Sequence, residues 1–328
     1  MNLTGARALV TGAGGFIGSH VVELLVRRGA AVTAFMHYRG TPTTGAMAYL
    51  EPSVLAAVRL VQGDIRDAEA VDEAVAGQDA VLHLAASISV PYSFVRPRDV
   101  LDTNTVGTYN VLAAARRCRP GRVVVVSSSE VYGTAQYVPI DEGHPLVGQS
   151  PYAASKIAAE KLAESFHRAF GVAAVVARPF NAYGPRQTTR AVIPVVLAQA
   201  IAGRPVRLGS LSPRRDFTYV TDTAAGLVAA AEADAAVGSV FNLGSGQDIS
   251  IGELVDLVGE VLGRPVAIEH EAERERPPAS EVMQLKADAS RARAILGWRA
   301  TVPLREGLRR TAEWLAHHPP ERRGGEAP

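Results

Sequence analysis

The chain has 328 residues, of which 47% are hydrophobic and 20% are charged, a composition typical of a globular protein with one or two domains. Lys and Arg (34) nearly balance Asp and Glu (33), so the charge gives no reason to expect a nucleic-acid or membrane partner. The single cysteine, Cys118, cannot form an intramolecular disulfide, no apolar run is long enough to span a membrane, and no signal-peptide pattern is present. We therefore expect a cytoplasmic protein.

The first predicted unit is a strand, a glycine turn and a helix. Residues 7–11 (RALVT) form a short apolar strand, and GAGGFIGSH leads into the helical pattern VVELLVRRG. At the spacing of Gly12, Gly15 and Gly18, the first glycine allows a tight turn, the second lets the backbone approach a diphosphate, and the third lets the helix pack on the strand. The amino end of the helix would face the phosphates with its partial positive charge. This pattern predicts a dinucleotide-binding unit.

The next three predicted strands end in residues that would surround a dinucleotide. The second strand, AAVTAFM, ends at His37, Tyr38 and Arg39, where NAD-binding units usually place an acid for the ribose 2′-hydroxyl. The expected cofactor is NAD. NADP stays open, because no acid is present at this strand end and Arg39 could instead meet a 2′-phosphate. The third strand, VRLVQ, leads to Asp64 and Ile65. The fourth, AVLHL, leads to small alanines that leave room for a cofactor, and its His83 is predicted to be a core histidine.

The alternation of elements predicts the fold class. A fifth strand is the four-valine run 123–126, and a sixth, VAAVVA, ends at Arg178. Six strands alternating with helical segments predict an α/β fold with a Rossmann-type doubly wound parallel sheet, and the less regular remainder predicts a smaller α/β C-terminal substrate domain. The expected division is an NAD(P)-binding domain of residues 1–180, joined by about 214–235, a substrate-binding domain of 181–213 and 236–316, and a disordered tail of 319–328.

The candidate chemistry lies between residues 127 and 156. Ser128 and Glu130 follow the carboxyl end of the valine strand, where open α/β sheets bind ligands. Tyr152 and Lys156 are four residues apart on a predicted helix, so the phenol and the ammonium share one face. The chain has three lysines and nine tyrosines, so this spacing would rarely arise by chance. A nearby ammonium and an oxidised nicotinamide both lower the pKa of a phenol, so Tyr152 is a candidate acid and base, with Lys156 as its electrostatic partner and a ribose ligand.

Several motifs together carry a family resemblance that reaches to about residue 316. TGAGGFIG, SSSEVYG, YAASK, RPFNAYGPR, RRDFTYV and ILGW resemble the extended short-chain dehydrogenase/reductases that act on nucleotide sugars. The stretches SEVYGTAQYVPIDEGHPLVGQSPYAASK and RPFNAYGPRQTTRAVIP are similar to nucleotide-sugar 4,6-dehydratases of the legionaminic-acid pathway type. The resemblance implies that Ser128 binds the sugar 4-hydroxyl, that Tyr152 takes its proton while hydride passes to the nicotinamide, and that the chain forms a homodimer through two helices of the Rossmann domain.

The resulting 4-ketone is a branch point between reactions. It acidifies the C5 proton, and a carboxylate can remove that proton so that water leaves from C6 before the hydride returns. The dehydratases and the UDP-glucuronate decarboxylases have a glutamate directly before VYG, as Glu130 is here, whereas the 4-epimerases usually lack one. The resemblance therefore implies 4,6-dehydration of an NDP-hexose, or of an NDP-N-acetylhexosamine. An NDP-sugar 4-epimerase, a UDP-glucuronate decarboxylase, and a non-enzymatic cofactor-binding sensor or scaffold are the alternatives.

Two positions depart from the usual dehydratase pattern. Threonine is usual where Ser128 stands, and the dTDP-glucose enzymes have Asp-Glu where this chain has Ser129-Glu130. GDP-mannose dehydratases also have Ser-Glu, so dehydration remains the expected reaction. The acid that protonates the departing hydroxyl has no assigned residue.

The resemblance also implies which residues bind the nucleotide sugar. Arg215 in RRDF and Arg276 in RERPPASE match positions that grip the substrate diphosphate, where a guanidinium forms paired hydrogen bonds to oxygen. The expected catalytic residues are Ser128, Glu130, Tyr152 and Lys156. The expected substrate-binding residues are Ser128, Ser129, Asn181, Arg186, Arg215 and Arg276. The expected cofactor-binding residues are Gly12, Gly15, Phe16, Ile17, Gly18, His37, Arg39, Asp64, Ile65, Leu84, Ala85, Ala86, Tyr152 and Lys156. No metal-ligand spacing occurs, so no metal is expected.

Overall fold

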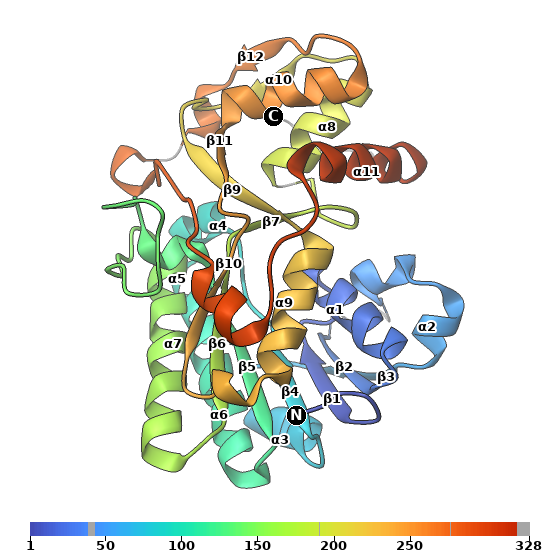
Figure 1. Ribbon diagram of the computed structural model, residues 1–328, viewed down its shortest axis with the longest axis vertical. Coiled ribbons are helices and arrows are strands. Elements are labelled where there is room, and N and C mark those ends of the chain that lie inside the picture. Colours follow the sequence, from blue (N-terminus) through green and yellow to red (C-terminus); the bar gives the residue numbers. More distant parts are fainter. Residues whose placement is uncertain (39–42, 190, 276, 320–328) are drawn as a thin grey trace.

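The computed structural model of the protein describes residues 1–38, 43–189, 191–275 and 277–319. Two expected site residues, Arg39 and Arg276, lie outside the described residues, as do residues 320–328 of the expected tail. A large sheet with helices on both faces forms the lower part of the molecule in Figure 1, and a smaller group of strands and helices lies above it.

Seven parallel strands form the large sheet, in the order β10-β6-β5-β4-β1-β2-β3. The strands are β1 (Arg7–Thr11), β2 (Ala31–His37), β3 (Arg59–Gly63), β4 (Ala80–His83), β5 (Arg122–Val126), β6 (Ala174–Pro179) and β10 (Val240–Leu243). The chain winds outward from β1 in one direction and from β4 in the other, so the order reverses between β1 and β4. Ligands of open α/β sheets bind beyond the carboxyl ends of the strands at this switch point. The predicted doubly wound Rossmann-type sheet is confirmed.

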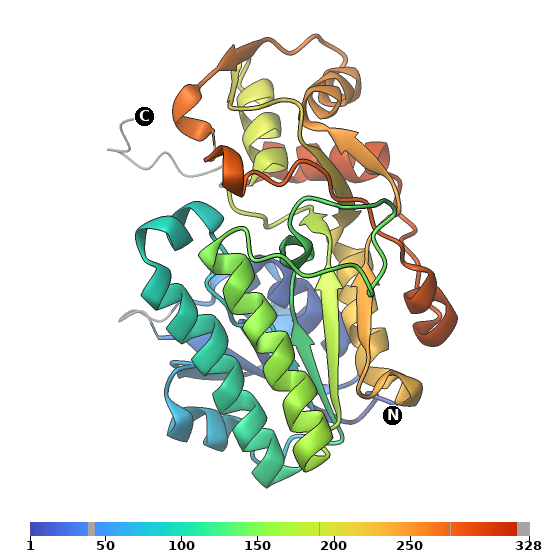
Figure 2. The same ribbon diagram turned by 90° about the vertical axis from the view of Figure 1, so that its left-hand side faces the viewer.

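Helices cover both faces because the strands are apolar on both sides. Val124 and Val126 of β5 join one core, and Val123 and Val125 join the other. One face is covered by α1 (Phe16–Arg27), α2 (Pro52–Ala56) and α9 (Val220–Glu232), and the other by α3 (Ala68–Val75), α6 (Gly107–Cys118) and α7 (Pro151–Phe170). Figure 2 shows α6 and α7 packed side by side on this second face. Two short helices, α4 (Val90–Val95) and α5 (Pro97–Leu101), precede α6.

One expected boundary needs correction at β10. The sequence placed residues 236–316 in the smaller domain, but β10 pairs in parallel with β6, with Val240 opposite Val176, and forms the edge of the large sheet. Phe241 and Leu243 of β10 are buried in the same core as α9. A four-residue apolar strand carries no local sign of the sheet it joins, because the partner strand is remote in the sequence.

The smaller group has its own core. It contains β7 (Asn181–Tyr183), β8 (Val206–Leu208), β9 (Arg214–Tyr219), β11 (Asp248–Ser250), β12 (Ile268–His270), α8 (Val192–Ile201), α10 (Ile251–Leu262) and α11 (Leu304–His317). β11, β9 and β7 form one small sheet, β12 and β8 form another, and the three helices pack on them. Because β6 ends at Pro179 and β7 begins at Asn181, this group adjoins the carboxyl edge of the large sheet. None of the helices in the described part of the chain has the length and hydropathy needed to span a lipid bilayer.

Candidate active site

The turn between β1 and α1 brings the ends of β1 and β4 into contact. Gly12 has a φ of 69°, and a Cβ there would lie 2.7 Å from the backbone nitrogen of Ala85. A Cβ at Gly18 would collide with the carbonyl oxygen of Gly12. The first backbone N–H groups of any helix have no partner within the helix. No side chain caps these groups in helix α1, which begins after Gly15. A bare helix amino terminus approached by a tight glycine turn fits a diphosphate.

The other expected cofactor-binding residues follow the neighbouring strands along the same edge. His37 ends β2, and its Nδ1 lies 3.9 Å from Oδ2 of Asp64, which follows β3. A hydrogen bond from Arg66, at 2.6 Å, holds the pKa of Asp64 below its usual value. Ile65 is buried against Gly107 at the start of α6. Directly after β4 come Leu84, Ala85 and Ala86.

Tyr152 is held in the first turn of α7. Ser150 caps this helix, since its hydroxyl accepts a hydrogen bond from the backbone N–H of Ala153 at 3.1 Å. The Tyr152 ring packs against Val90 and Val100. Burial raises the pKa of Tyr152 to about 12, hydrogen bonding to Ser128 lowers it, and the negative charge of Glu130 raises it. The Tyr152 phenol therefore lies close to both residues.

Lys156 lies one helical turn beyond Tyr152 and is almost fully buried. Its Nζ donates a hydrogen bond to the carbonyl oxygen of Val126, the last residue of β5, at 2.9 Å. Burial lowers the pKa of Lys156 to about 8, and the negative charge of Glu160 raises it. Residue Lys156 thus joins α7 to the carboxyl end of β5.

Glu130 lies on a short 3₁₀ turn, Ser129–Tyr132, that directly follows β5. The Ser128 hydroxyl caps this turn by accepting a hydrogen bond from the backbone N–H of Glu130 at 3.2 Å. Ser128 therefore contacts both the Glu130 backbone and the phenol of Tyr152. Strand β5 and helix α7 bring the four expected catalytic residues to one place.

Two buried polar atoms near the carboxyl ends of β5 and β6 have no hydrogen-bond partner among the described residues. They are Oγ of Ser127, directly before Ser128, and Oδ1 of Asn181, at the start of β7. Ser129, the other expected substrate residue in this region, is 3% exposed. Buried polar atoms normally have a partner, so such orphans point to a group supplied by a ligand.

The expected arginines make contacts within the protein. Nη2 of Arg186 lies 2.6 Å from Oε2 of Glu23 on α1, and Arg186 has a φ of 69°. Nη2 of Arg215, in β9, lies 3.1 Å from Oε1 of Glu281. Arg186 ties the segment after β7 to helix α1, whereas Arg215 lies in the smaller sheet that adjoins the carboxyl edge.

Asn104 lies next to the expected site, and the sequence did not single it out. It lies on a π-helical turn, Asp102–Val106, between α5 and α6, and such turns frequently occur at functional sites. Its Oδ1 accepts a hydrogen bond from the backbone N–H of Ser87 at 2.7 Å, and its Nδ2 donates to Oγ of Ser155 at 2.9 Å. Asn104 thereby joins the loop after β4 to the helix that carries Tyr152. The segment TNTVGTYNVL reads as ordinary helix, so no local signal marks this turn.

His83 is a core histidine, as the sequence predicts. Its Nδ1 lies 2.8 Å from Oγ1 of Thr11, and its Nε2 lies 3.0 Å from Oγ1 of Thr108. The Thr108 hydroxyl donates to the carbonyl oxygen of Asn104, so it accepts the Nε2 proton of His83. Burial and the charge of Lys156 lower the pKa of His83 to about 3, which keeps the ring neutral.

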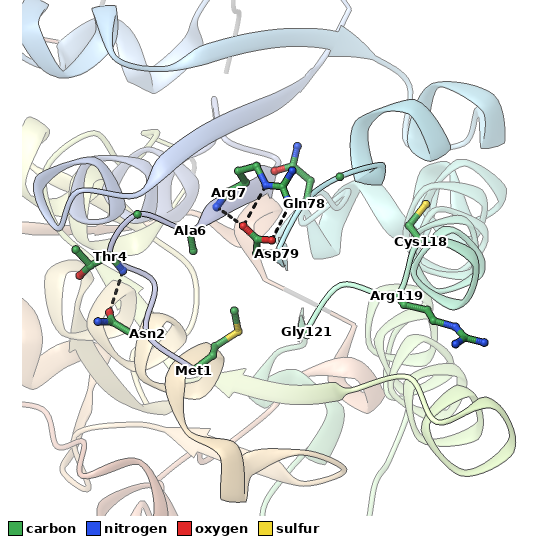
Figure 3. Close-up of a pocket in the computed structure, with 12 residues that line it drawn as sticks. Met1, Asn2, Thr4, Ala6, Arg7, Gln78, Asp79, Cys118, Arg119 and Gly121 are labelled. Atoms are coloured by element: carbon green, nitrogen blue, oxygen red, sulfur yellow. Dashed lines mark hydrogen bonds and ion pairs between the residues drawn. The ribbon is translucent and has the colours of Figure 1, made fainter.

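A hollow of about 590 Å³ lies at the opposite, amino-terminal edge of the large sheet (Figure 3). Its lining includes Arg7, Asp79, Cys118 and Arg119, and Arg7 pairs with Asp79 at 2.8 Å. The expected catalytic residues all follow the carboxyl ends of strands, so this hollow has no part in the constellation around Tyr152.

Comparisons with known proteins agree with this geometry. A family model described as GDP-mannose 4,6 dehydratase matches residues 9–311. A dTDP-glucose 4,6-dehydratase of Actinoplanes sp. is 34% identical over 319 residues, which cover 94% of this chain and 97% of that protein. UDP-glucuronic acid decarboxylase 1 of Xenopus tropicalis is 32% identical over 318 residues, covering 94% of this chain and 72% of that protein.

The chain is also similar in three-dimensional structure to a solved protein. The UDP-glucuronic acid 4-epimerase of Bacillus cereus, described in complex with NAD and a substrate analogue, has a TM-score of 0.86 and 27% identity. The match covers 95% of this chain and 99% of the other. Dehydratases, a decarboxylase and an epimerase thus share this chain's fold and most of its length. The chain therefore belongs to the extended short-chain dehydrogenase/reductase family of NAD-dependent nucleotide-sugar epimerases and dehydratases.

Proposed function

We propose that the protein is a nucleotide-sugar 4,6-dehydratase that converts an NDP-hexose, or an NDP-N-acetylhexosamine, into the 4-keto-6-deoxy sugar. The observation that carries the proposal is the place of Glu130 beside Tyr152. The charge of Glu130 acts on the Tyr152 phenol, and Ser128, which caps the Glu130 turn, hydrogen-bonds to that phenol. A carboxylate at this position would be the base that removes a second proton from a sugar bound at Tyr152.

NAD is the proposed cofactor. The turn from Gly12 to Gly18 and the bare amino terminus of α1 would hold its diphosphate, and Lys156 would bind its ribose. When bound, NAD accepts a hydride from the sugar and later returns it, so none is consumed overall. NADP remains an alternative because His37 at the end of β2 is not an acid.

The proton chemistry is assigned to this chain's own residues. Ser128 binds the sugar 4-hydroxyl, and Tyr152 as phenolate accepts its proton when C4 is oxidised. The Lys156 ammonium favours the phenolate by its charge. The C4 ketone acidifies the hydrogen on C5, and Glu130 removes it as a proton. The C6 hydroxyl, protonated by an acid to which no residue is assigned, leaves as water, and a C5–C6 double bond forms. Hydride return to C6 and proton return to C5 complete the 4-keto-6-deoxy product.

The substrate class is proposed from the relatives and from the polar groups near the site. The relatives reported above are named for dTDP-glucose, UDP-glucuronic acid and GDP-mannose, which are all sugar nucleotides. Asn181, whose buried Oδ1 has no hydrogen-bond partner in the described part of the chain, is the proposed sugar-contacting residue. Arg215 is the proposed diphosphate ligand, since a planar guanidinium matches phosphate oxygens. Arg186 also stays a proposed substrate ligand: Glu23 binds its Nη2, and its Nη1 has no hydrogen-bond partner among the described residues.

The test is a panel of UDP-, GDP-, dTDP- and CDP-hexoses with the product mass as readout. We expect one sugar nucleotide to lose the mass of one water, with no net reduction of NAD. Loss of carbon dioxide would replace the proposal by decarboxylation, and conversion without a change of mass by epimerisation. No turnover of any sugar nucleotide by a folded, NAD-loaded protein would favour a sensor or scaffold.

We also propose that the protein is a homodimer through α6 and α7. The support is a set of exposed apolar side chains on this face, namely Leu101, Val106, Tyr109 and Phe170. A second copy would cover the same face by two-fold symmetry. Val106→Arg should convert the dimer to a monomer in light scattering after size exclusion. Ile268→Arg, at an equally exposed apolar position on β12, is the matched control and should stay dimeric. A monomeric parent protein would refute this assignment.

A further inference from the structure

Glu160 and Arg178 form a buried ion pair next to the proposed active site. Glu160 lies on α7 one turn beyond Lys156, and Arg178 lies near the end of β6. The guanidinium binds both carboxylate oxygens, with Nε at 2.8 Å from Oε1 and Nη2 at 2.6 Å from Oε2. Each side chain is 4% exposed. This geometry fixes the Glu160 carboxylate on the helix that carries Lys156, one turn further along.

Lys156 needs a source of negative charge because burial opposes its charged form. Its described hydrogen bond goes to a neutral group, the carbonyl oxygen of Val126. The titratable groups around it are Tyr152 and Glu160 on α7, His83 on β4 and, beside Tyr152, Glu130 on the turn after β5. His83 is neutral in its two hydroxyl contacts, and burial keeps the phenol of Tyr152 protonated in the ligand-free protein. Glu160 lies one turn from Lys156 on the same helix, and it is the carboxylate whose charge raises the pKa of Lys156.

We propose that Glu160 is a positioning residue that keeps the Lys156 ammonium charged, and that Arg178, by binding the Glu160 carboxylate, fixes its position and limits its pull on Lys156. The inference deepens the proposed function, because a charged Lys156 is what favours the phenolate of Tyr152. The pKa of Lys156 agrees with this arrangement, since burial lowers it to about 8 and the charge of Glu160 opposes that shift.

The proposal predicts opposite effects from two variants that break the same ion pair. In Arg178→Gln the Glu160 charge is no longer offset by a guanidinium, so its pull on Lys156 becomes stronger. In the double variant Glu160→Gln/Arg178→Gln both charges are gone, and burial alone acts on Lys156. If the ion pair had only a structural role, the titration midpoint of Lys156 would change in the same direction in both variants, because each variant loses the same contact.

The measurement is direct titration of Lys156 by NMR with ¹³Cε- and ¹⁵Nζ-labelled lysine. The chain has three lysines, so a Lys161→Arg/Lys286→Arg background leaves Lys156 as the single lysine signal. The background protein should titrate near pH 8. The midpoint should fall by about one pH unit in the double variant and rise by about one pH unit in Arg178→Gln. Arg178→Lys keeps the charge and should restore the background midpoint of Lys156; it adds a second lysine signal, which an Arg178→Lys/Lys156→Met sample identifies.

An unchanged midpoint in both variants, or a shift in the same direction, would overturn the inference. Circular dichroism on the same samples checks that each variant is folded. If Arg178→Gln does not fold, the midpoints of the double variant and of Arg178→Lys still test the proposal. The double variant lacks the Glu160 charge, whereas Arg178→Lys keeps it. The titration needs neither cofactor nor substrate, so its result does not depend on which reaction the protein catalyses. If the substrate panel showed a reaction other than dehydration, the proposed function would fail and the titration result would still hold.

Discussion

Two clusters at the carboxyl edge of the large sheet each combine a buried tyrosine, a buried cation and a glutamate. In the first, the Tyr132 hydroxyl donates to Oδ1 of Asn242 at 2.6 Å and accepts from Nη1 of Arg178 at 2.7 Å. Arg178 also binds both carboxylate oxygens of Glu160. Burial raises the pKa of Tyr132, and the charge of Arg178 opposes this shift. The polar groups of this cluster bind one another, which suits a structural role.

The second cluster contains Tyr152, Lys156 and Glu130. Lys156 carries three donor protons and directs one of its hydrogen bonds to the carbonyl oxygen of Val126. The Tyr152 phenol hydrogen-bonds to Ser128, a side chain that can rotate its own proton toward a ligand. The comparison teaches that burial and charge alone do not mark a catalytic group. Spare hydrogen-bonding capacity next to a shifted pKa distinguishes the second cluster from the first.

The sharpest test of the comparison removes the tyrosine hydroxyl from each cluster in turn. Tyr152→Phe should reduce turnover by about 10³-fold or more, because the proposed acid and base is lost. It should also abolish transient reduction of NAD on adding the sugar nucleotide. Tyr132→Phe should retain turnover and lower the free energy of unfolding by about 1–3 kcal/mol, since Asn242 and Arg178 lose a buried partner. Persistent reduced nicotinamide in Tyr152→Phe would contradict the division between the clusters.

Glu130→Gln separates the second proton transfer from the first. Cofactor and substrate binding should remain, because the amide has nearly the same shape. Exchange of the sugar C5 hydrogen with heavy-water solvent should fall by about 10²–10³-fold, since the proposed base is neutral. NMR or mass spectrometry of recovered substrate measures this exchange. Exchange at the parent rate would remove Glu130 from the mechanism.

The two cations should differ in how they affect stability. Unfolded lysine keeps its charge up to its ordinary pKa of 10.5, whereas Lys156 in the folded protein loses it near pH 8. The unfolded state therefore binds more protons between these values, and the contribution of Lys156 to stability rises with pH across this window. Lys156→Met should stabilise the protein at about pH 7 by about 2 kcal/mol and lose most of that gain near pH 10.

Arg178→Met should act in the opposite direction. It leaves the buried Glu160 carboxylate without its partner, which costs about 3–5 kcal/mol. Urea unfolding of both variants, at about pH 7 and about pH 10, measures these effects. Equal destabilisation by the two substitutions at pH 7 would mean that both cations are structural.

Much of the fold and the candidate site could be predicted because the relevant signals are local. The strand, glycine turn and helix around Gly12 are adjacent in sequence, and so are Tyr152 and Lys156 on one helix face. The four-valine run shows a strand buried on both sides, and it places Ser128 at the carboxyl edge of the sheet. These features require only short-range periodicity and chain connectivity.

Other features depend on partners that lie far apart in the sequence. β10 joins the large sheet through β6, more than sixty residues earlier. Arg186 meets Glu23 on α1, 163 residues earlier in the chain. Asn104 turns inward on a π-helical turn whose sequence reads as ordinary helix. No pattern within a short window could indicate any of these three contacts.

The sequence by itself therefore determined the dinucleotide turn, the α/β class and the residue types of the catalytic constellation. Their spacing encodes which groups share a turn, a strand end or a helix face. Only the tertiary structure decided which buried tyrosine is saturated and which has capacity for a ligand, and that Glu160 and Arg178 lie beside Lys156. The physical reason is that hydrogen-bond saturation and desolvation depend on every neighbour of a group, and most neighbours come from remote segments of the chain.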